Sequence, residues 1–450
     1  MHFYKKNEVV RAKVTSWGEK GLGSVDEGRS SLLLPDVLPG ETITAKVVKT
    51  GKSWAYGKLL NVMNPSSARV KAVCDVAVRC GGCQLQHVRY DEQLAYKKDR
   101  VVQAFLDRKI SSPEIIVHGM PDPLAYRQKG QFAISKTPDG DILMGLTAAR
   151  SQRVIDTKKC WIQPEPVNLA LDEIRRFLIS TDNAIFSTSP PQEGIAHVAF
   201  RWTDTPSQLI VTLVSHSTVP QWETLRDALN KIPEFIALYL SINKNPEWSV
   251  LGPEQILLWG KSEVYQTISD LDLHVSAQSF SQSNAKQTAL LWDRVAHLLK
   301  PLAEETIWDL YCGSGGMSMY LAKKSAKVIG IEENNQSIAD AKINLERNAI
   351  NHCEIIQGDV GDAIQTISGV CQGIVVNPPR KGLDPEVIAA ILKKRPERMV
   401  YVSCSPDTLV RDLAVFIANG ASIEAVEIVD FFPQTYHIET VVLLNLGLIY

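Results

Sequence analysis

Residues Glu305–Ala322 read ETIWDLYCGSGGMSMYLA, and this stretch decides the fold class. The apolar run Thr306–Leu310 predicts a buried strand, and the glycines at 313, 315 and 316 predict a tight turn that leads into a helix. A strand, a glycine turn and a helix in this order are typical of doubly wound α/β proteins, where backbone N–H groups of the turn approach a ligand. The sequence therefore predicts a Rossmann-like α/β domain with a ligand site at the carboxyl ends of its strands.

The following residues repeat the strand pattern. Val328–Glu332 and Ile355–Asp359 each end a predicted strand with an acid, and Gly373–Arg380 ends a fourth strand with a proline turn that contains Asn377. An acid about 20 residues after the glycine turn is placed to bind the two hydroxyls of a ribose. In place of the G-x-G-x-x-G pattern of dehydrogenases, the first strand carries Asp309 ahead of Cys-Gly-Ser-Gly. This arrangement resembles the S-adenosylmethionine pocket of class I methyltransferases, with a nicotinamide cofactor as the alternative.

A second informative stretch is Met399–Asp412, MVYVSCSPDTLVRD. It predicts a buried strand that breaks at Ser403–Pro406, followed by a helix from Asp407. Cys404 would lie at the carboxyl end of this strand, where open α/β sheets bind ligands. A thiol there can act as a nucleophile once it is deprotonated, but free cysteines are also among the most buried residues. The segment by itself leaves both interpretations open.

Three of the eight cysteines are clustered, as Cys74, Cys80 and Cys83 in a C-x5-C-x2-C arrangement. Cys160 is the nearest further cysteine that could complete a set of four ligands. Four thiolates fit a [4Fe–4S] cluster or a structural zinc ion, and the missing second pair favours iron–sulfur. The C-x3-C-x2-C spacing of radical enzymes is absent, which argues against radical chemistry.

The net charge of −2 hides an uneven distribution. Residues 1–150 hold 23 Lys and Arg against 15 Asp and Glu, whereas the remaining 300 residues hold 25 against 35. A basic first third indicates a polyanionic partner, with a solvated basic surface as the alternative. No apolar run approaches the roughly 20 residues that span a bilayer, and the first ten residues lack the apolar core of a signal peptide. We therefore expect a cytoplasmic protein.

Three domains are predicted. Short alternating strands and glycine turns over residues 1–62 predict a small OB-like β-barrel, of a kind that binds RNA, and their order resembles a TRAM domain. Residues 63–260 are expected to form an α+β domain with the four-cysteine site and helices near Val167–Leu178 and Trp222–Asn230. A helix over 91–106 is expected to pack on the catalytic domain, which is predicted to cover residues 261–450.

Five motifs occur in the order of one enzyme family. They are SAQSFSQSN (276–284), WDLYCGSGG (308–316), VNPPRKG (376–382), YVSCSPDTLVRD (401–412) and DFFPQTYHIETVV (430–442). Together they resemble the RNA uracil-5-methyltransferase family, and the combination with a TRAM barrel and a cluster resembles its 23S ribosomal-RNA members more than its transfer-RNA member. The resemblance implies S-adenosylmethionine as methyl donor, a [4Fe–4S] cluster, a 23S ribosomal-RNA substrate and a chain that acts as a monomer.

The resemblance also assigns residues to roles. Cys404 matches the family's nucleophile and Glu439 its general base. The cofactor pocket is matched by Gln282, Asp309, Tyr311, Gly313, Glu332, Asp359 and Asn377. Substrate-facing positions are Phe280, Arg127, Arg380 and His437, and cluster ligands are Cys74, Cys80, Cys83 and Cys160. The family usually has Asp where this chain has Asn377, which removes a carboxylate beside the reaction centre.

The chemistry of uracil explains why these residue types are needed. Carbon 5 is a poor nucleophile until a thiolate adds to carbon 6, and a base must later remove the hydrogen from carbon 5 so that the thiolate can leave. His437 and Glu439 alternate in a predicted strand and would share one face. The alternatives are a transfer-RNA uridine substrate, methylation of RNA cytosine at carbon 5, and a non-catalytic ribosomal-RNA assembly factor.

Overall fold

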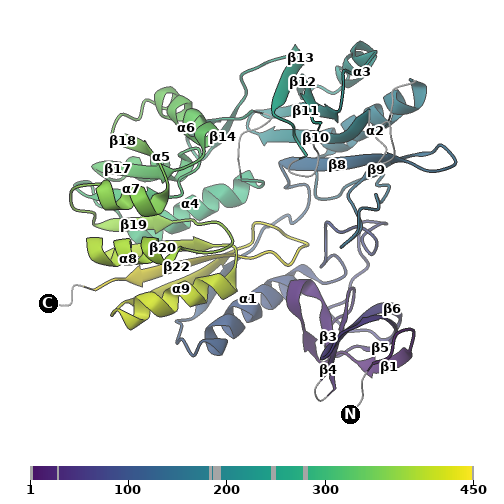
Figure 1. Ribbon diagram of the computed structural model, residues 1–450, viewed down its shortest axis with the longest axis horizontal. Coiled ribbons are helices and arrows are strands. Elements are labelled where there is room, and N and C mark those ends of the chain that lie inside the picture. The colour runs from purple at the N-terminus through teal and green to yellow at the C-terminus, as the bar shows by residue number, and fades with distance from the viewer. Residues whose placement is uncertain are drawn as a thin grey trace. The chain divides into compact units, whose positions relative to one another are not determined.

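The computed structural model describes residues 4–27, 30–181, 185, 194–244, 250–276 and 282–447 (Figure 1). The chain forms two compact units. The first contains residues 1–97, 132–161 and 432–437, and the second contains residues 98–131, 162–431 and 438–450. The division into three domains stays a prediction, because the boundaries of these two units are of a different kind. Among the described residues, no helix has the length and apolar character needed to cross a membrane.

The first unit contains a curled six-stranded sheet in the order β1-β5-β6-β4-β3-β2. Ile43, Ala45 and Val47 are fully buried, as their alternation in the sequence predicted, and they share a core with Leu32 and Leu34. The curled sheet is compatible with the predicted barrel-like module, although β5 and β6, with 9 and 11 residues, are longer than the expected short strands. Its elements are β1 (Val9–Lys13), β2 (Ser16–Trp17), the 3-10 helix η1 (Glu19–Gly21), β3 (Gly23–Glu27), β4 (Ser30–Leu34), β5 (Thr42–Thr50) and β6 (Trp54–Asn64).

An α+β region follows, with its strands in the order β13-β12-β11-β10-β8-β9. β10–β13 belong to the second unit, whereas β9 and the part of β8 from Phe132 onward belong to the first. The three helices predicted up to residue 260 are confirmed, as α1 (Tyr90–Asp107), α2 (Glu165–Ser180) and α3 (Trp222–Leu229). The strands of this sheet are β8 (Lys129–Lys136), β9 (Ile142–Gly145), β10 (Ile195–Asp204), β11 (Ser207–Ser215), β12 (Phe235–Ile242) and β13 (Glu254–Gly260). A separate hairpin follows, with strands β14 (Tyr265–Ile268) and β15 (Leu271–His274).

The second unit is built on an eight-stranded sheet in the order β18-β17-β16-β19-β20-β22-β21-β7. Its first five strands are parallel, as the glycine-turn unit predicted, and β22 runs antiparallel between β20 and β21. The strands are β7 (Ile115–His118), β16 (Thr306–Leu310), β17 (Lys327–Glu332), β18 (Cys353–Gln357), β19 (Gly373–Val376), β20 (Arg398–Ser403), β21 (Ser422–Val429) and β22 (Glu439–Asn445).

Helices cover both faces of this sheet (Figure 1). One core cluster joins Val101 and Phe105 of α1 to Tyr401 of β20 and to Leu409 and Phe416 of α9, and it also takes in α7 and α8. Burial on both faces explains why the strands read as continuous apolar runs. The helices are α4 (Ala285–Leu299), α5 (Gly316–Ala322), α6 (Asn335–Arg347), α7 (Val360–Thr366), α8 (Pro385–Lys394) and α9 (Pro406–Ala418).

Glu427 on β21 is a buried carboxylate that joins three elements of the second unit. Both of its oxygens accept hydrogen bonds from Arg294 of α4, at 2.8 and 2.7 Å, and His118 of β7 lies 2.8 Å away. Burial raises the pKa of Glu427, but the hydrogen bonds from Arg294 and His118 outweigh burial and lower it overall.

Removal of Arg294 is expected to destabilise the second unit. The Arg294→Met variant leaves the Glu427 carboxylate buried beside His118 alone, and we expect a loss of about 3 kcal/mol in the free energy of unfolding. Urea denaturation measures this loss. The Arg294→Met/Glu427→Met double variant should recover most of it, because no charge is then left unpaired. Equal losses in the two variants would show that the pair does not hold these elements together.

Candidate active site

The turn between β16 and α5 depends on backbone conformations that few residues adopt. Tyr311, Gly313 and Gly315 have φ angles of 64°, 58° and 79°, in the left-handed region. The N–H of Gly313 donates a 3.0 Å hydrogen bond to Glu332 at the end of β17. Glu332 also accepts from the N–H of Asn334, at 2.8 Å. The predicted turn and its predicted acid are thus in direct contact.

Asp309 is a buried acid at the carboxyl end of the central strand β16. It is 2% exposed, and its Oδ2 accepts a 2.6 Å hydrogen bond from the hydroxyl of Ser318 on α5. Burial raises the pKa of Asp309 to about 7, although the Ser318 hydrogen bond works in the opposite direction. A carboxyl group that titrates near neutral pH in a pocket suits a cationic ligand, which would hold it in its charged form.

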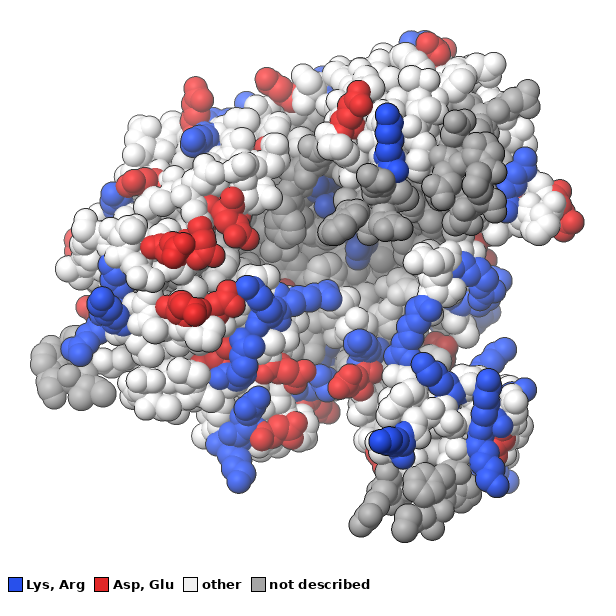
Figure 2. Space-filling view, in the orientation of Figure 1, with Lys and Arg blue, Asp and Glu red and all other residues white. Residues whose placement is uncertain are grey.

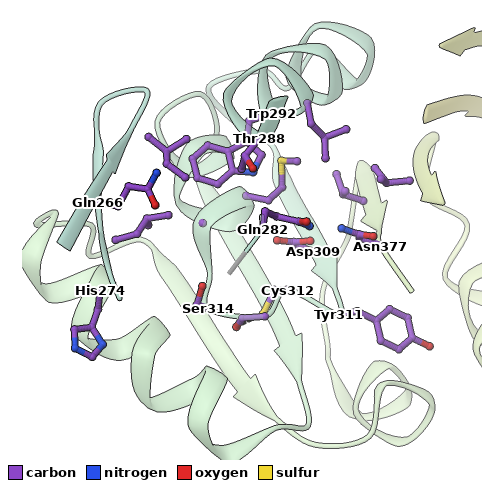
Figure 3. A pocket seen from close by; sticks show the side chains of 18 of the residues that line it. Gln266, His274, Gln282, Thr288, Trp292, Asp309, Tyr311, Cys312, Ser314 and Asn377 are labelled. Carbon is purple, nitrogen blue, oxygen red and sulfur yellow. Dashed lines mark hydrogen bonds between the residues drawn. The ribbon is translucent and has the colours of Figure 1, made fainter. Parts of the chain in front are cut away.

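A pocket opens above Asp309 and encloses about 850 Å³, including space open to solvent (Figure 3). Asp309 and Asn377 lie near each other at the ends of neighbouring strands, where the N–H of Asn377 donates to the carbonyl of Leu310. Five of the predicted cofactor residues line this pocket: Gln282, Asp309, Tyr311, Gly313 and Asn377. Glu332 and Asp359 do not, and Asp359 instead caps α7 through hydrogen bonds from Gly361 and Asp362.

Part of the pocket wall could not be predicted from motifs. Thr288 and Trp292 come from α4, and Gln266 and His274 come from the β14–β15 hairpin. Figure 3 shows Thr288, Trp292 and Gln266 around the same space as Asp309. For Thr288 and Trp292 the only sequence signal is the apolar periodicity of α4, which predicts a helix but not the ligand that the helix faces.

The predicted nucleophile and base meet at the ends of two paired strands. β20 pairs antiparallel with β22, with Ser403 opposite Thr440, and the same register continued by one residue sets Cys404 opposite Glu439. Glu439 is 9% exposed and Cys404 is half-buried. Burial raises the pKa of the Cys404 thiol, and the negative charge of Glu439 raises it further.

Arg380 offsets both negative charges. Its side chain donates a hydrogen bond to Cys404, and its positive charge lowers the pKa of that thiol. Burial raises the pKa of Glu439 to about 8, and the charge of Arg380 limits this rise. Cys404, Glu439 and Arg380 therefore form one electrostatically coupled group, called here the thiol–carboxylate site.

The loop that carries Arg380 is held by α9. Asp412, which is buried, accepts 2.8 Å hydrogen bonds from the N–H of Leu383 and from the hydroxyl of Tyr401. Thr408 donates to the carbonyl of Arg380 at 3.2 Å. The φ angle of Gly382 is 78°, and a Cβ there would lie 2.5 Å from the Asp412 carboxylate. The end of the stretch that contains Cys404 thus also fixes the position of Arg380.

The remaining predicted substrate residues lie in different surroundings. Arg127 is half-buried, and its Nε donates to the carbonyl of Lys129 at 2.9 Å. Phe280 lies outside the described residues. β22 begins at Glu439, so His437 precedes the strand, and the expectation that both share one strand face was wrong. His437 instead contacts the ring of Tyr436 in the turn before β22, where Gln434 has a φ angle of 69°.

The four predicted metal ligands occur together in the first unit. Cys83 is half-buried, and its pKa is raised to about 12 by desolvation and further by the charges of Cys160, Cys80 and Cys74. The N–H of Gly82 points at the sulfur of Cys80, at 3.4 Å. Within the described part of the chain, no three His, Cys, Asp or Glu side chains are arranged as a metal site. The structure therefore brings the thiols near one another but not to a common centre.

The site can be compared with known proteins. A sequence model of the tRNA (uracil-5-)-methyltransferase family matches residues 89–446. A protein of Halalkalibacterium halodurans named as an uncharacterized RNA methyltransferase is 35% identical over 452 residues, covering 98% of each chain. A protein of Clostridium tetani with the same description is 33% identical over 452 residues, covering 98% of this chain and 97% of its own.

One solved structure extends this similarity to three dimensions. It is the tRNA (uracil-54, C5)-methyltransferase of Pyrococcus abyssi in complex with S-adenosyl-L-homocysteine. It superposes with a TM-score of 0.80 and 25% sequence identity, over 96% of this chain and 99% of that one.

The opposing influences on Cys404 predict opposite changes in its reactivity. Arg380→Gln removes the charge that lowers the pKa of Cys404, so its alkylation by iodoacetamide at pH 8 should slow, roughly severalfold. Glu439→Gln removes the opposing charge, so alkylation should accelerate. Mass spectrometry of the peptide that contains Cys404 gives both rates.

Lys381→Gln is the matched control for these rates. Lys381 is the neighbouring exposed cation and pairs with Asp384 at 2.7 Å, so its loss should leave the alkylation rate near that of the wild type. If the variants of Arg380 and Glu439 shift the rate in the same direction, the thiol–carboxylate site is not coupled as described.

Proposed function

The chain belongs to the tRNA (uracil-5-)-methyltransferase family, and from this we propose that it transfers a methyl group from S-adenosylmethionine to carbon 5 of a uridine in 23S ribosomal RNA. The observation that carries the proposal is the thiol–carboxylate site, in which Cys404, Glu439 and Arg380 act on one another. The reaction needs a nucleophilic thiol and a base that can reach the same pyrimidine ring.

The residues of this site divide the reaction between them. The Cys404 thiolate adds to carbon 6 of the uracil, and the electron pair of the carbon 5–carbon 6 bond moves to give an enolate. Carbon 5 of this enolate would then bond to the methyl group of bound S-adenosylmethionine, and the bond from that methyl group to sulfur would break, which leaves a neutral thioether. The Glu439 carboxylate then takes the proton from carbon 5, the double bond re-forms, and Cys404 leaves as a thiolate. Arg380 favours the anionic form of Cys404 before it attacks and after it leaves, and the anionic form of Glu439 before it takes the proton.

The same charges imply a pH dependence. The pKa of Glu439 is raised to about 8, and the pKa of Cys404 is raised as well. Both groups act in their deprotonated forms, so the fraction of active enzyme grows as the pH rises from about 6 to about 9. The neutral amide of Asn377 fits this balance, because it adds no further negative charge beside the buried acids.

The pocket above Asp309 fits a methyl donor of this kind. S-adenosylmethionine is a cation, and Asp309 offers a buried carboxyl group whose charged form a cation would stabilise. Trp292 and Met317 supply apolar contacts. We propose that Gln282, Asp309, Tyr311, Gly313 and Asn377 line the bound donor and that Glu332 and Asp359 hold its polar groups from the strand ends.

The class of RNA that the enzyme methylates is a separate part of the proposal. The four cysteines and the basic first third support ribosomal RNA, whose folded segments need phosphate contacts and extrusion of the target base. Transfer RNA is the second candidate, because the archaeal transfer-RNA enzyme aligns with 96% of this chain and domain layout therefore does not separate the two substrates. Mapping of 5-methyluridine in both RNA classes, with and without the protein, decides between them.

If the reaction passes through a covalent intermediate, substitutions of Cys404 and Glu439 should have different effects. Cys404→Ala should abolish methyl transfer yet bind RNA like the wild type, because no adduct can form. Glu439→Gln should accumulate a covalent RNA–protein species, because carbon 5 keeps its proton and the thiolate cannot leave. Denaturing gels detect this species, and nucleoside analysis distinguishes 5-methyluridine from 5-methylcytosine. Normal turnover by Cys404→Ala would disprove the mechanism, and an assembly factor would show RNA binding without any transfer.

We also propose that Cys74, Cys80, Cys83 and Cys160 hold a [4Fe–4S] cluster. Gly81 and Gly82 pass close to other parts of the first unit, since a Cβ at Gly81 would lie 2.8 Å from the carbonyl of Thr147. Such close backbone passage, with an N–H aimed at a cysteine sulfur, suits a cluster that cross-links loops. The methyl transfer has no redox step, so the role assigned to the cluster is structural.

Purification without oxygen tests the cluster directly. We expect a brown protein that absorbs near roughly 400 nm and carries about four iron atoms per chain. Cys83→Ala should lose the iron, whereas the control Cys371→Ala should keep it, because Cys371 is buried in the other unit. A colourless protein loaded with zinc would contradict the proposal.

A further inference from the structure

Three strands of the barrel carry positive charge without any acid. β1, β5 and β6 contain Arg11, Lys13, Lys46, Lys49 and Lys58 and have no Asp or Glu. All five side chains are exposed. They point outward, because the alternate positions, such as Ile43, Ala45 and Val47, fill the core. Figure 2 shows Lys and Arg side chains over the area where Figure 1 labels these strands.

The register places like charges against each other. β5 pairs antiparallel with β6, and Lys46 lies directly opposite Lys58. Like charges at opposed positions of an antiparallel pair destabilise the sheet. In the described part of the chain, neither lysine takes part in an ion pair that would offset this repulsion. The charges therefore cost stability in the free protein, and an anionic ligand would remove this cost.

Two aromatic rings lie at one end of the same surface. Trp54 and Tyr56 alternate with the buried Ala55 on β6, and their ring centroids are 5.0 Å apart. The guanidinium of Arg150 lies 4.2 Å from the centre of the Tyr56 ring, and the Lys49 ammonium lies 5.8 Å from the Trp54 ring. Gly51 leaves space for the indole of Trp54, since a Cβ at Gly51 would collide with it.

Cations beside half-buried surface rings are the elements of single-stranded RNA binding. Lysine and arginine neutralise phosphates, and nucleobases stack on aromatic rings and on guanidinium planes. A duplex keeps its bases stacked inside and cannot use the rings in this way. An acidic protein would use the charges but has no need of the aromatic pair. The combination therefore favours an RNA strand with unpaired bases.

We propose that the outer surface of β1, β5 and β6, together with Arg150, binds a single-stranded segment of the substrate RNA. This surface is called the basic–aromatic face. Phosphates lie along Arg11, Lys13, Lys46 and Lys58, and a base stacks at Tyr56 and Trp54. This assignment rests on the proposed function only because it takes RNA as the ligand. It adds which surface of the barrel binds the RNA, and that the bound RNA is single-stranded.

The salt dependence of binding tests the charges. The full-length protein is titrated with a 20-nucleotide uridine-rich single-stranded RNA over a range of salt concentrations. A plot of log K against log salt falls with a negative slope. In the Lys46→Gln/Lys58→Gln variant this slope should be less steep by roughly 1.4, because each lost phosphate contact removes about 0.7 from its magnitude. The stability of this variant to urea should equal or exceed that of the wild type, since the cross-strand repulsion is gone. The control Lys20→Gln removes a barrel charge outside this face and should make the slope less steep by less than half as much.

Aromatic variants test the stacking separately. Tyr56→Leu should weaken binding of the single strand by about 5-fold to 100-fold with an unchanged salt slope, and Tyr56→Phe should retain wild-type binding. Binding of a duplex RNA of the same length and of heparin should not respond to Tyr56→Leu. A response of heparin equal to that of the single strand, or wild-type slopes in the lysine variant, would overturn the assignment.

Methyl transfer to unmodified ribosomal RNA, measured in the same preparations, separates this inference from the proposed function. The lysine variant should raise the KM for RNA and leave kcat unchanged. If the wild-type protein binds the single strand but forms no 5-methyluridine, the proposed function is disproved, whereas RNA binding by the basic–aromatic face is still supported. Normal 5-methyluridine formation together with unaltered binding by all variants would disprove the face alone.

Discussion

The site depends on one electrostatic constraint, the placement of a buried carboxylate beside a thiol that must also carry charge in the proposed mechanism. Glu439 and Cys404 lie at paired ends of β22 and β20, and each disfavours the ionisation of the other. Arg380 is the cation that acts on both. Without it, burial would keep the site neutral, because separated charges in a low-dielectric interior are costly. The chemistry of the site therefore depends on where the Arg380 loop lies.

The fold fixes that loop through an acid that has no chemical role of its own. Asp412 on α9 holds the loop at Leu383 and also binds Tyr401 on β20. One side chain thus connects the strand before Cys404 to the loop that carries Arg380. Asp309 acts in a similar way at the other side of the sheet, where Ser318 joins the central strand to the helix behind the glycine turn. In both places a buried acid with a defined partner positions a ligand-facing segment.

The barrel shows the opposite use of charge. At the thiol–carboxylate site unlike charges are brought together in the interior. On the basic–aromatic face Lys46 and Lys58 oppose each other at the surface, with no ion pair to either among the described residues. Surface repulsion of this kind is weak for each pair and is screened by salt. It can therefore persist in a stable sheet and still provide a strong, salt-dependent attraction for a polyanion.

The sequence by itself determined the local elements, and it pointed to the residues proposed to react. The strand at Thr306–Leu310, the glycine turn after it and helices α1 to α3 follow from periodicity and turn chemistry, which neighbouring residues control. Only the tertiary structure decided which distant groups meet, because strand register and loop position depend on pairings across the whole sheet. It therefore set Arg380 beside Cys404 and Glu439, brought Trp292 to the pocket wall, and placed His437 outside the strand.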